Sequence, residues 1–218
     1  MPEINLLQSL PKSKRNLEER FEKKDQEVIR ISRQFGKDYF DGLRQFGYGG
    51  YRYDGRWRSV ARDFISNYSL KPGMRVLDIG CAKGFLVKDL LIECPGLEVF
   101  GLDISQYAIL NCESEVVGRL HLGSANKLNF PDKSFDLVFS INTLHNLERE
   151  GVKDALKEIE RVSRGSSYIV VDSYRTQFEK DLFSKWVLTA KFHDFPDGWT
   201  KLFEEVGYSG DYSWTIVQ

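Results

Sequence analysis

A short apolar run that leads directly into a glycine-rich turn is the feature that most limits what this chain can fold into. The segment is VLDIGCAKGFL, residues 76–86, in which Asp78 is followed by Gly80, Ala82 and Gly84. The run predicts a strand, and the apolar residues after the last glycine predict the first turn of a helix. Strand, tight turn and helix in this order are typical of open α/β sheets, which bind ligands beyond the carboxyl ends of their strands. We therefore expect an α/β fold with a ligand site at this turn.

From residue 75 onward, short β-rich runs alternate with stretches of helical periodicity. Strands are expected in RVLDI from residue 75, EVFGLD from 98, RLHLG from 119, FDLVFSI from 135, SYIVVDS from 167, WVLTAKFH from 186 and YSWTIV from 212. Helices are expected at 16–40, from Trp57 to near Pro72, at 84–94, 105–115 and 150–163, after Thr176, and at 199–206. This alternation predicts βαβ units, and hence a doubly wound, Rossmann-like, mostly parallel seven-stranded sheet with a hairpin-like ending.

The N-terminal third has a different pattern, so residues 1–70 are expected to form a helical lid ahead of a core domain at residues 71–218. Charges alternate densely over residues 16–40 while apolar residues keep helix-like spacing, which predicts one amphipathic helix. Residues 39–57 interleave glycine and aromatic residues with arginine, which indicates a structured loop that glycines allow to move. The polar residues 1–15 are expected to be a loose arm unless they dock.

The charge balance argues against one broad class of partner. With 31 Lys and Arg against 32 Asp and Glu, the chain lacks the cationic excess of a protein that grips a long nucleic acid. No apolar run approaches the roughly 18 residues of a membrane span, and the first residues lack the pattern of a secretory signal. We therefore expect a cytoplasmic protein with no membrane partner. Its cysteines, Cys81, Cys94 and Cys112, lack paired spacing and are expected to be reduced and packed.

The spacing of the glycine turn distinguishes between nucleotide ligands. A dinucleotide site favours G-x-G-x-x-G, whereas this chain has G-x-A-x-G preceded by Asp78, whose charge disfavours a phosphate. With these residues the chain resembles the class I S-adenosylmethionine-dependent methyltransferases, over roughly residues 70–218. The resemblance implies that Asp78, Gly80, Ala82 and Gly84 hold the amino-acid and sulfonium end of S-adenosylmethionine, whose product is S-adenosylhomocysteine. Ala82 replaces the family's usual middle glycine, and its methyl group is tolerated if φ there is negative.

Two further segments fit the same resemblance. Asp103 ends the second expected strand, where an acidic residue at this distance binds ribose in Rossmann folds, and Ile104 follows it. The segment GSANKLNFPDKSFDLVFS resembles the family's adenine-binding segment, so Ser124, Ala125 and Asn126 are expected at the adenine. Two other readings stay open: a nicotinamide-dependent oxidoreductase, and a protein that keeps the fold but has lost catalysis.

The end of the fourth expected strand supplies a candidate base. In SINTLHNLE, residues 140–148, the family layout puts Asn142 and His145 near the methyl donor. His145 is the first candidate for a general base, and the alternative is a histidine that only shapes the turn. His193 is a weaker candidate, and His121 is expected to be structural. The motif of enzymes that methylate nucleic-acid bases, Asn or Asp before two prolines and an aromatic, is missing, and no acidic set indicates a metal.

Arginine and aromatic residues near the expected crevice indicate the kind of acceptor. An arginine can clamp a phosphate or carboxylate, and a tyrosine can stack on a sugar or base, so we expect a small anionic acceptor. The residues expected to contact it are Tyr48, Tyr51, Arg52, Arg56, Tyr174 and Arg175. The alternative is that the N-terminal aromatics only dock the first helices on the core.

The chain also resembles, over its whole length, uncharacterised bacterial methyltransferases of surface-polysaccharide gene clusters. The segments that carry this resemblance are LPKSKRN, YFDG, GYGGYRYDGRW and GYSGDYSWTIV. It implies O-methylation of a nucleotide-linked or phosphorylated sugar. A phosphonate or phosphoramidate is the alternative acceptor, and a protein or RNA comes third. The acceptor atom and the oligomeric state stay open.

Overall fold

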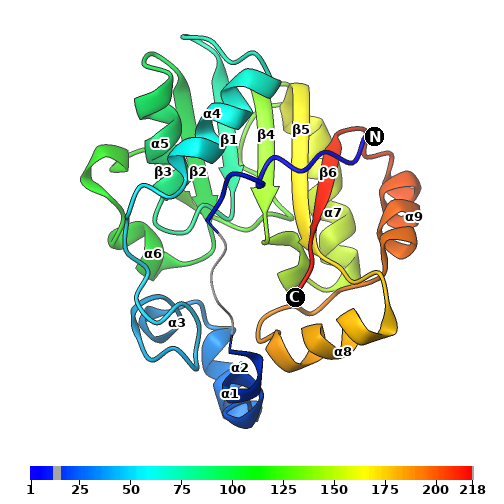
Figure 1. Cartoon of the computed structure of the whole chain (residues 1–218). Helices are drawn as coiled ribbons and strands as arrows, with labels where there is room; N and C mark the ends of the chain where they lie inside the picture. Colours follow the sequence, from blue (N-terminus) through cyan, green and yellow to red (C-terminus); the bar gives the residue numbers. More distant parts are fainter. Residues whose placement is uncertain (12–15, 218) are drawn as a thin grey trace.

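The computed structural model describes residues 1–11 and 16–217, and within them six strands form one parallel sheet (Figure 1). The strand order is β3-β2-β1-β4-β5-β6, and every neighbouring pair is parallel. The strands are β1 Arg75–Ile79, β2 Glu98–Asp103, β3 Leu120–Leu122, β4 Phe135–Ile141, β5 Ser163–Asp172 and β6 Asp211–Thr215. The order reverses at β1, so the carboxyl ends of β1 and β4 mark the switch point at which such sheets bind ligands.

Helices cover both faces of the sheet (Figure 1). Leu77 of β1 and Val138 of β4 lie in the core beneath α7 and α9, whereas Val76 and Leu137 lie in the core beneath α4 and α5. This alternation follows from the two-residue period of a strand. The α-helices are α1 Leu17–Glu22, α2 Gln26–Ser32, α3 Lys37–Asp41, α4 Arg58–Asn67, α5 Phe85–Glu93, α6 Gln106–Leu110, α7 Arg149–Val162, α8 Gln177–Trp186 and α9 Pro196–Val206. Two 3-10 turns are η1 Ser114–Val116 and η2 Leu144–Asn146.

The seventh strand expected in residues 186–193 is wrong for the described part of the chain. Trp186 is the last residue of α8. The main-chain N–H groups of Lys191 and Phe192 donate to the carbonyl of His145, at 2.8 and 3.1 Å, instead of to a neighbouring strand. The hairpin-like ending is also wrong, because β6 runs parallel to β5.

The single helix expected over residues 16–40 is instead three short helices, α1 to α3. Asp25 starts a new helix in the middle of the charged run, because its carboxylate accepts a hydrogen bond from the N–H of Val28 at 2.7 Å. Phe35 has a φ of 49°, and Gly36 then caps α3, so the backbone turns again. Helix-like apolar spacing therefore continues across two breaks, the first set by the side-chain cap of Asp25 and the second by the backbone at Phe35 and Gly36.

The first residues dock along the edge of the sheet. Glu3 pairs with Tyr212 beside β6 in a parallel bridge, and the N–H of Ile4 donates to the Tyr212 carbonyl at 2.9 Å. The N–H of Leu6 donates to the hydroxyl of Tyr168 at 3.2 Å, and the Leu6 side chain is buried in the α4–α5 core. The described part of the expected arm is therefore docked; residues 12–15 lie outside the described residues. A domain boundary near residue 70 stays a prediction.

Helices α1, α2, α3 and α8 lie together beyond the carboxyl ends of the strands (Figure 1). With the loop at residues 42–57, we call them the cap. Lys24 of α1's C-terminal turn donates to the carbonyl of Ser184 in α8 at 2.6 Å, and Arg33 donates to the carbonyl of Ala190 at 3.2 Å. The cap is thus built from two distant parts of the sequence. That it moves as a lid stays a prediction.

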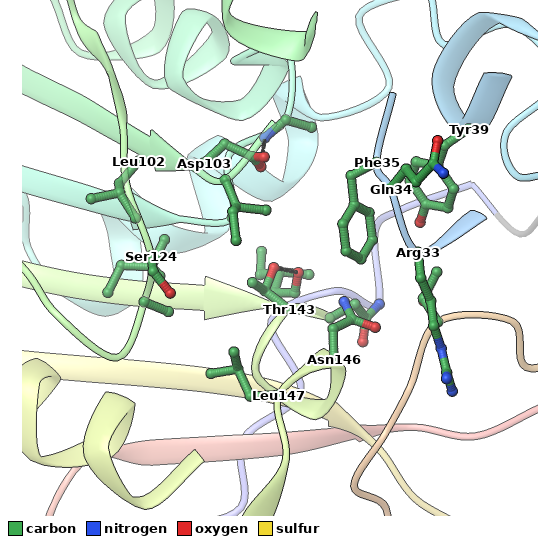
Figure 2. Close-up of a pocket in the computed structure, with 18 of the residues that line it drawn as sticks. Arg33, Gln34, Phe35, Tyr39, Leu102, Asp103, Ser124, Thr143, Asn146 and Leu147 are labelled. Atoms are coloured by element: carbon green, nitrogen blue, oxygen red, sulfur yellow. Dashed lines mark hydrogen bonds between the residues drawn. The ribbon is translucent and has the colours of Figure 1, made fainter. Parts of the chain in front are cut away.

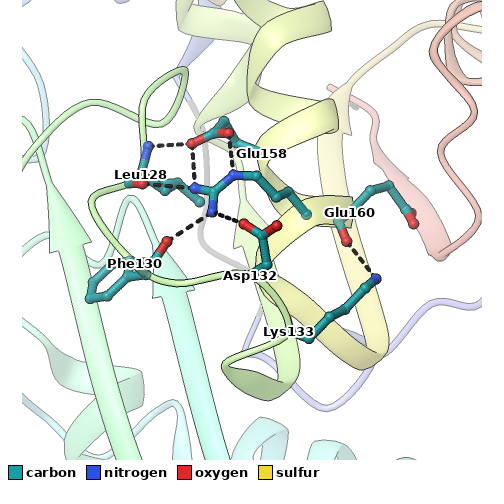
Figure 3. A network of polar contacts seen from close by, with 7 residues as sticks. Leu128, Phe130, Asp132, Lys133, Glu158 and Glu160 are labelled. Carbon is teal, nitrogen blue, oxygen red and sulfur yellow. Dashed lines mark hydrogen bonds and ion pairs between the residues drawn. The ribbon is translucent and has the colours of Figure 1, made fainter.

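Arg161 of α7 fixes the loop that leads into β4 (Figure 3). Its guanidinium donates to both carboxylate oxygens of Glu158 at 2.7 and 2.8 Å, and to Asp132 at 2.6 Å. It also donates to the carbonyls of Leu128 and Phe130, each at 2.8 Å. Charge-assisted, bidentate bonds of this kind are among the stronger polar contacts in proteins. One side chain therefore holds the segment that connects β3 to β4.

We predict that Arg161→Ala lowers the free energy of unfolding by about 2 kcal/mol, because two carbonyls and two carboxylates lose this donor. The Arg161 side chain is 31% exposed, so water replaces part of what is lost. Urea unfolding followed by circular dichroism measures the change. The matched control is Arg30→Ala, whose exposed pair with Glu27 is expected to leave the free energy of unfolding almost unchanged. Equal effects of the two variants would contradict the assignment.

Candidate functional site

Two adjoining cavities open at the carboxyl ends of the strands. The first, of about 480 Å³, lies over the ends of β1, β2 and β4. The second, of about 540 Å³, lies between the ends of β4 to β6 and the cap. Both volumes are in the range of small-molecule sites. The residues that line both cavities are Tyr39, Tyr48, Asn142 and Thr189, so the two spaces meet there.

The glycine-rich turn forms one wall of the first cavity. Gly80 has a φ of 85°, and a Cβ atom added there would overlap the side chain of Thr143, so no larger residue fits. Ala82 has a φ of 51°, so the negative φ that was the condition for tolerating its methyl group is not found. The left-handed conformation costs a non-glycine residue about 1–2 kcal/mol. The Ala82 methyl group packs with Phe40 and Ala108, and its N–H is held by Asp103, which offsets that cost.

Asp103 ends β2 at the centre of this wall (Figure 2). One carboxylate oxygen accepts from the N–H of Ala82 and the other from the N–H of Ser105, both at 2.8 Å. Burial raises the pKa of Asp103, and the hydrogen bonds from the main chain oppose that shift. A carboxylate has about four lone-pair sites, so two remain for the hydroxyls of a ligand.

Asp78 differs from the other residues expected at the turn. It is 5% exposed and is not among the residues that line either cavity. Burial, together with the negative charge of Asp103, raises its pKa well above the usual range. The structure therefore places two carboxyl groups in apolar surroundings near each other, with Asp78 set behind the surface of the cavity.

The opposite wall contains the residues expected at an adenine. Ile104, Ser124 and Ala125 line the first cavity, and 60% of the Ile104 side chain is exposed there. Asn126 is not a lining residue, although its amide oxygen accepts from the Ser124 hydroxyl at 2.6 Å. Asn146, which the sequence did not single out, also faces this cavity, and its buried amide oxygen has no hydrogen-bond partner among the described residues (Figure 2). An unpartnered buried acceptor is a feature that a ligand donor would satisfy.

The cap covers the first cavity from the other side, with Phe35 and Tyr39 facing Asp103 and Thr143 (Figure 2). It is joined to the glycine-rich turn through Asp41 of α3. The carboxylate of Asp41 accepts from Lys83 Nζ at 2.6 Å, from the hydroxyl of Tyr107 at 2.7 Å and from a main-chain N–H of the cap. The buried Lys83 belongs to the turn itself, so cap and turn are connected by one ion pair.

His145 lines the second cavity, but both of its ring nitrogens are engaged. Nδ1 accepts from the N–H of Asp172 at 3.0 Å, so the ring proton lies on Nε2, which is 3.3 Å from the carboxylate of Asp172. Burial lowers the pKa of His145, and the Asp172 charge opposes that shift. A neutral histidine without a free lone pair cannot accept a substrate proton in this arrangement. The geometry favours the turn-shaping alternative for His145.

The residues expected at an acceptor separate into two groups. Tyr48, Tyr51, Arg52 and Arg56 line the second cavity. The Tyr51 ring also stacks on Phe85 at 4.5 Å between centroids, so part of this loop docks the cap on the core, as the alternative expected.

Tyr174 and Arg175 are not brought to either cavity. Tyr174 is buried, and its hydroxyl lies 3.1 Å from His193 Nδ1. Arg175 extends outward, 3.6 Å from the carboxylate of Glu3. The chain turns away from the crevice directly after β5, which is why a position at a strand end did not place these side chains in it.

Three charged residues that line the second cavity were not among the expected site residues. Asp172 ends β5, and the rule that identified Asp103 at the end of β2 would also have found it. Arg44 lies in the loop at residues 39–57, whose pattern did not distinguish it, and Arg20 had no such signal because its partner, α8, is remote in sequence.

No described helix is long and apolar enough to cross a membrane. In the part of the chain that the structure describes, no group of three or more His, Cys, Asp or Glu residues could hold a metal ion. Cys81, Cys94 and Cys112 are free thiols.

Comparison with known proteins shows that the chain is similar to methyltransferases. Residues 77–171 match a family model described as a methyltransferase domain. A sterol 24-C-methyltransferase of Gibberella zeae is 33% identical over 113 residues, which are 47% of this chain and 30% of that protein. A demethylmenaquinone methyltransferase of Symbiobacterium thermophilum is 28% identical over 161 residues, which are 70% of this chain and 61% of that protein. The chain thus spans less than two thirds of the length of these curated relatives.

The fold has counterparts among solved structures. The crystal structure of an S-adenosylmethionine-dependent methyltransferase from Archaeoglobus fulgidus superposes with a TM-score of 0.56 at 26% identity, over 69% of this chain and 66% of that one. The parallel sheet and the turn closed by Asp103 agree with these likenesses, so residues 77–171 are similar in sequence and in fold to S-adenosylmethionine-dependent methyltransferase domains.

Proposed function

We propose that this chain transfers a methyl group from S-adenosylmethionine to an oxygen of a small anionic acceptor, such as a nucleotide-linked or phosphorylated sugar. The observation that carries the proposal is the second cavity. It adjoins the first at Asn142 and is lined by four arginines, Arg20, Arg44, Arg52 and Arg56, but by one carboxylate, Asp172. A role in surface-polysaccharide biosynthesis in the cytoplasm is part of the same proposal and rests on resemblance alone.

The first cavity fits S-adenosylmethionine. Asp103 keeps lone pairs for the two ribose hydroxyls, Ile104 and Ala125 offer an apolar surface for adenine, and Asn146 supplies an unpartnered acceptor. The cofactor supplies a methyl group on a positively charged sulfur when bound. Asp78 and Asp103 provide buried negative charge on the side of the cavity formed by the glycine-rich turn. A cationic ligand is favoured there, whereas a pyrophosphate would be repelled.

The second cavity favours an anionic acceptor of small size. Its lining carries an excess of positive charge, although the chain as a whole has a formal charge of −1. The cap encloses it, which suits a small molecule better than a protein or RNA chain. The relatives reported above are named for a sterol and for demethylmenaquinone, so their names do not choose an acceptor for this chain.

Asp172 is the residue that we assign as proton acceptor. Its side chain is 16% exposed, lies in the second cavity at the end of β5 and is held by the neutral His145. The hydroxyl of Thr215, which is paired with Asp172 across β5 and β6, donates to the amide oxygen of Asn142 at 2.8 Å. Asp172 therefore lies next to the point at which the two cavities meet. Its carboxylate would take the hydroxyl proton of the acceptor as the oxygen–carbon bond forms and the sulfur–methyl bond breaks, with S-adenosylhomocysteine as the leaving group.

We predict that Asp103→Asn weakens binding of S-adenosylhomocysteine about ten- to a hundred-fold, because a charged acceptor of hydrogen bonds is lost. Isothermal titration calorimetry measures the affinity, and circular dichroism checks the fold. Asp154→Asn, an exposed change on α7, is the matched control and should leave affinity unchanged. Unchanged affinity in the Asp103 variant would remove this residue from the cofactor site.

We predict that binding of S-adenosylmethionine releases protons. Burial raises the pKa of Asp103 and, more strongly, of Asp78, so the ligand-free protein binds protons that a nearby cation displaces. Affinity should rise with pH above the ordinary carboxyl range of about 4 and level off above the raised pKa values. Over the same window the ligand-free protein should lose stability, since raised carboxyl pKa values stabilise the fold only at lower pH.

Calorimetry in two buffers of different ionisation enthalpy counts the released protons. Asp78→Asn should reduce the number. Equal binding enthalpies in both buffers would show that neither carboxyl group is linked to the ligand.

We predict that Asp172→Asn reduces kcat by about 10²- to 10⁴-fold with little change in cofactor affinity. His145→Gln keeps a donor beside Asp172 and should retain more activity than His145→Ala, because His145 positions the carboxylate. Steady-state kinetics over a range of pH make the measurement. If His145 were itself the base, both histidine variants would lose as much activity as the aspartate variant, and the assignment would be reversed.

A further inference from the structure

Two arginines from different segments meet on one tryptophan in the second cavity. Arg20 belongs to α1, Arg44 to the loop after α3, and Trp186 to the end of α8. The guanidinium carbons of Arg20 and Arg44 lie 4.6 and 5.4 Å from the centroid of the Trp186 ring. All three residues line the cavity. The flat ring holds the two positive groups near each other.

These two arginines lack the partners that other arginines of this chain have. In the described residues, no carboxylate lies within ion-pair distance of either guanidinium, whereas Arg56, Arg161 and Arg164 each have one at 2.6–2.7 Å. Arg20 donates to the carbonyls of Gln45 and Gly47, at 3.0 and 3.3 Å. Arg44 also donates to the carbonyl of Gly47. Main-chain carbonyls carry only partial charge, so they do not neutralise the pair.

The arrangement is electrostatically unfavourable without a counterion. Arg20 is 7% exposed, and burial, with the positive charge of Arg44 as the next cause, lowers its pKa to about 10. Burying a charge without a partner is costly, and a second like charge adds to that cost. Guanidinium groups have five N–H donors each, so donors remain free on both side chains. An anion in the cavity would neutralise the positive charge and would accept hydrogen bonds from the free N–H groups.

We infer that Arg20 and Arg44, held on Trp186, form a subsite for the phosphate group of the acceptor. This inference rests on the proposed function and specifies how the acceptor is oriented in the second cavity. A phosphate monoester or diphosphate carries close to two negative charges and several acceptor oxygens, which match two guanidinium forks. A single carboxylate matches only one of them.

Within the second cavity, this subsite and the proton acceptor Asp172 are at different places. Neither arginine lies within ion-pair distance of Asp172, and Asp172 is beside Asn142, where the two cavities meet. A phosphate oxygen would be repelled by that carboxylate and attracted to the arginines. The phosphate group therefore anchors the acceptor in the cavity. A hydroxyl at the opposite end of the acceptor molecule receives the methyl group. This orientation disfavours the phosphonate or phosphoramidate alternative.

Inorganic pyrophosphate is the probe that tests the subsite without methyl transfer. Titrated into the full chain at low ionic strength, it should bind, and Arg44→Gln should weaken its binding about ten- to a hundred-fold. Arg44 is exposed, so this variant is expected to fold. Arg20→Gln should act in the same direction, and Arg20→Lys should recover only part of the affinity because it lacks the fork. The matched control is Arg149→Gln, a surface change on α7.

Three results would overturn the inference. One is equal pyrophosphate binding in wild type and Arg44→Gln. Another is loss of binding in Arg52→Gln or Arg56→Gln while Arg44→Gln binds normally, which would move the subsite to the loop. The third is tighter binding of succinate than of pyrophosphate, which would make the ligand group a carboxylate. None of these readouts uses the cofactor, so a failure here is separate from a failure of the methyltransferase proposal, which methyl transfer from labelled S-adenosylmethionine tests.

Discussion

The carboxylate of Asp103 is the contact on which the geometry of the first cavity depends. Its two oxygens hold the N–H groups of Ala82 and Ser105, and so join the turn after β1 to the start of α6. The turn must place backbone close to a ligand, which requires positive φ at several positions, one of them an alanine. A fixed acceptor at the end of the neighbouring strand stabilises that backbone. The buried charge then serves both the fold and a cationic ligand.

The cap transfers this local geometry to a second cavity. Asp41 binds Lys83 of the turn, while Lys24 and Arg33 donate to the main-chain carbonyls of Ser184 and Ala190. The second cavity formed in this way has walls from the cap and from Leu10 and Pro11, from the strand ends and from residues 186–189 and 215–217. Its lining is accordingly mixed: the arginines come from the cap, the carboxylate comes from the end of β5, and the histidine comes from the turn η2 after β4.

The parts of the structure that could be predicted are those set by local sequence. Short-range periodicity predicts the strands that begin at residues 75, 98 and 135. Glycine spacing predicts the turn between Gly80 and Gly84. Asp103 follows from its position at a strand end. By contrast, the start of α2 depends on Asp25 acting as a cap, and residues 186–193 depend on hydrogen bonds to His145, far away in sequence. The position of Arg20 in the second cavity could not be predicted, because it depends on contact with Trp186 of α8, which is far away in sequence.

The docking of the first residues against β6 has a consequence for how the chain reaches its native state. Glu3 and Ile4 pair with Tyr212, and Leu6 bonds to Tyr168, so these residues have partners at least 162 positions further along the chain. Contacts of such long sequence separation slow folding, because a large loop must close before they form. Until then the apolar face that Leu6 covers stays open to water, as does the edge of the sheet. The pairing of residues 3–6 with β5 and β6 is therefore expected to form late in folding.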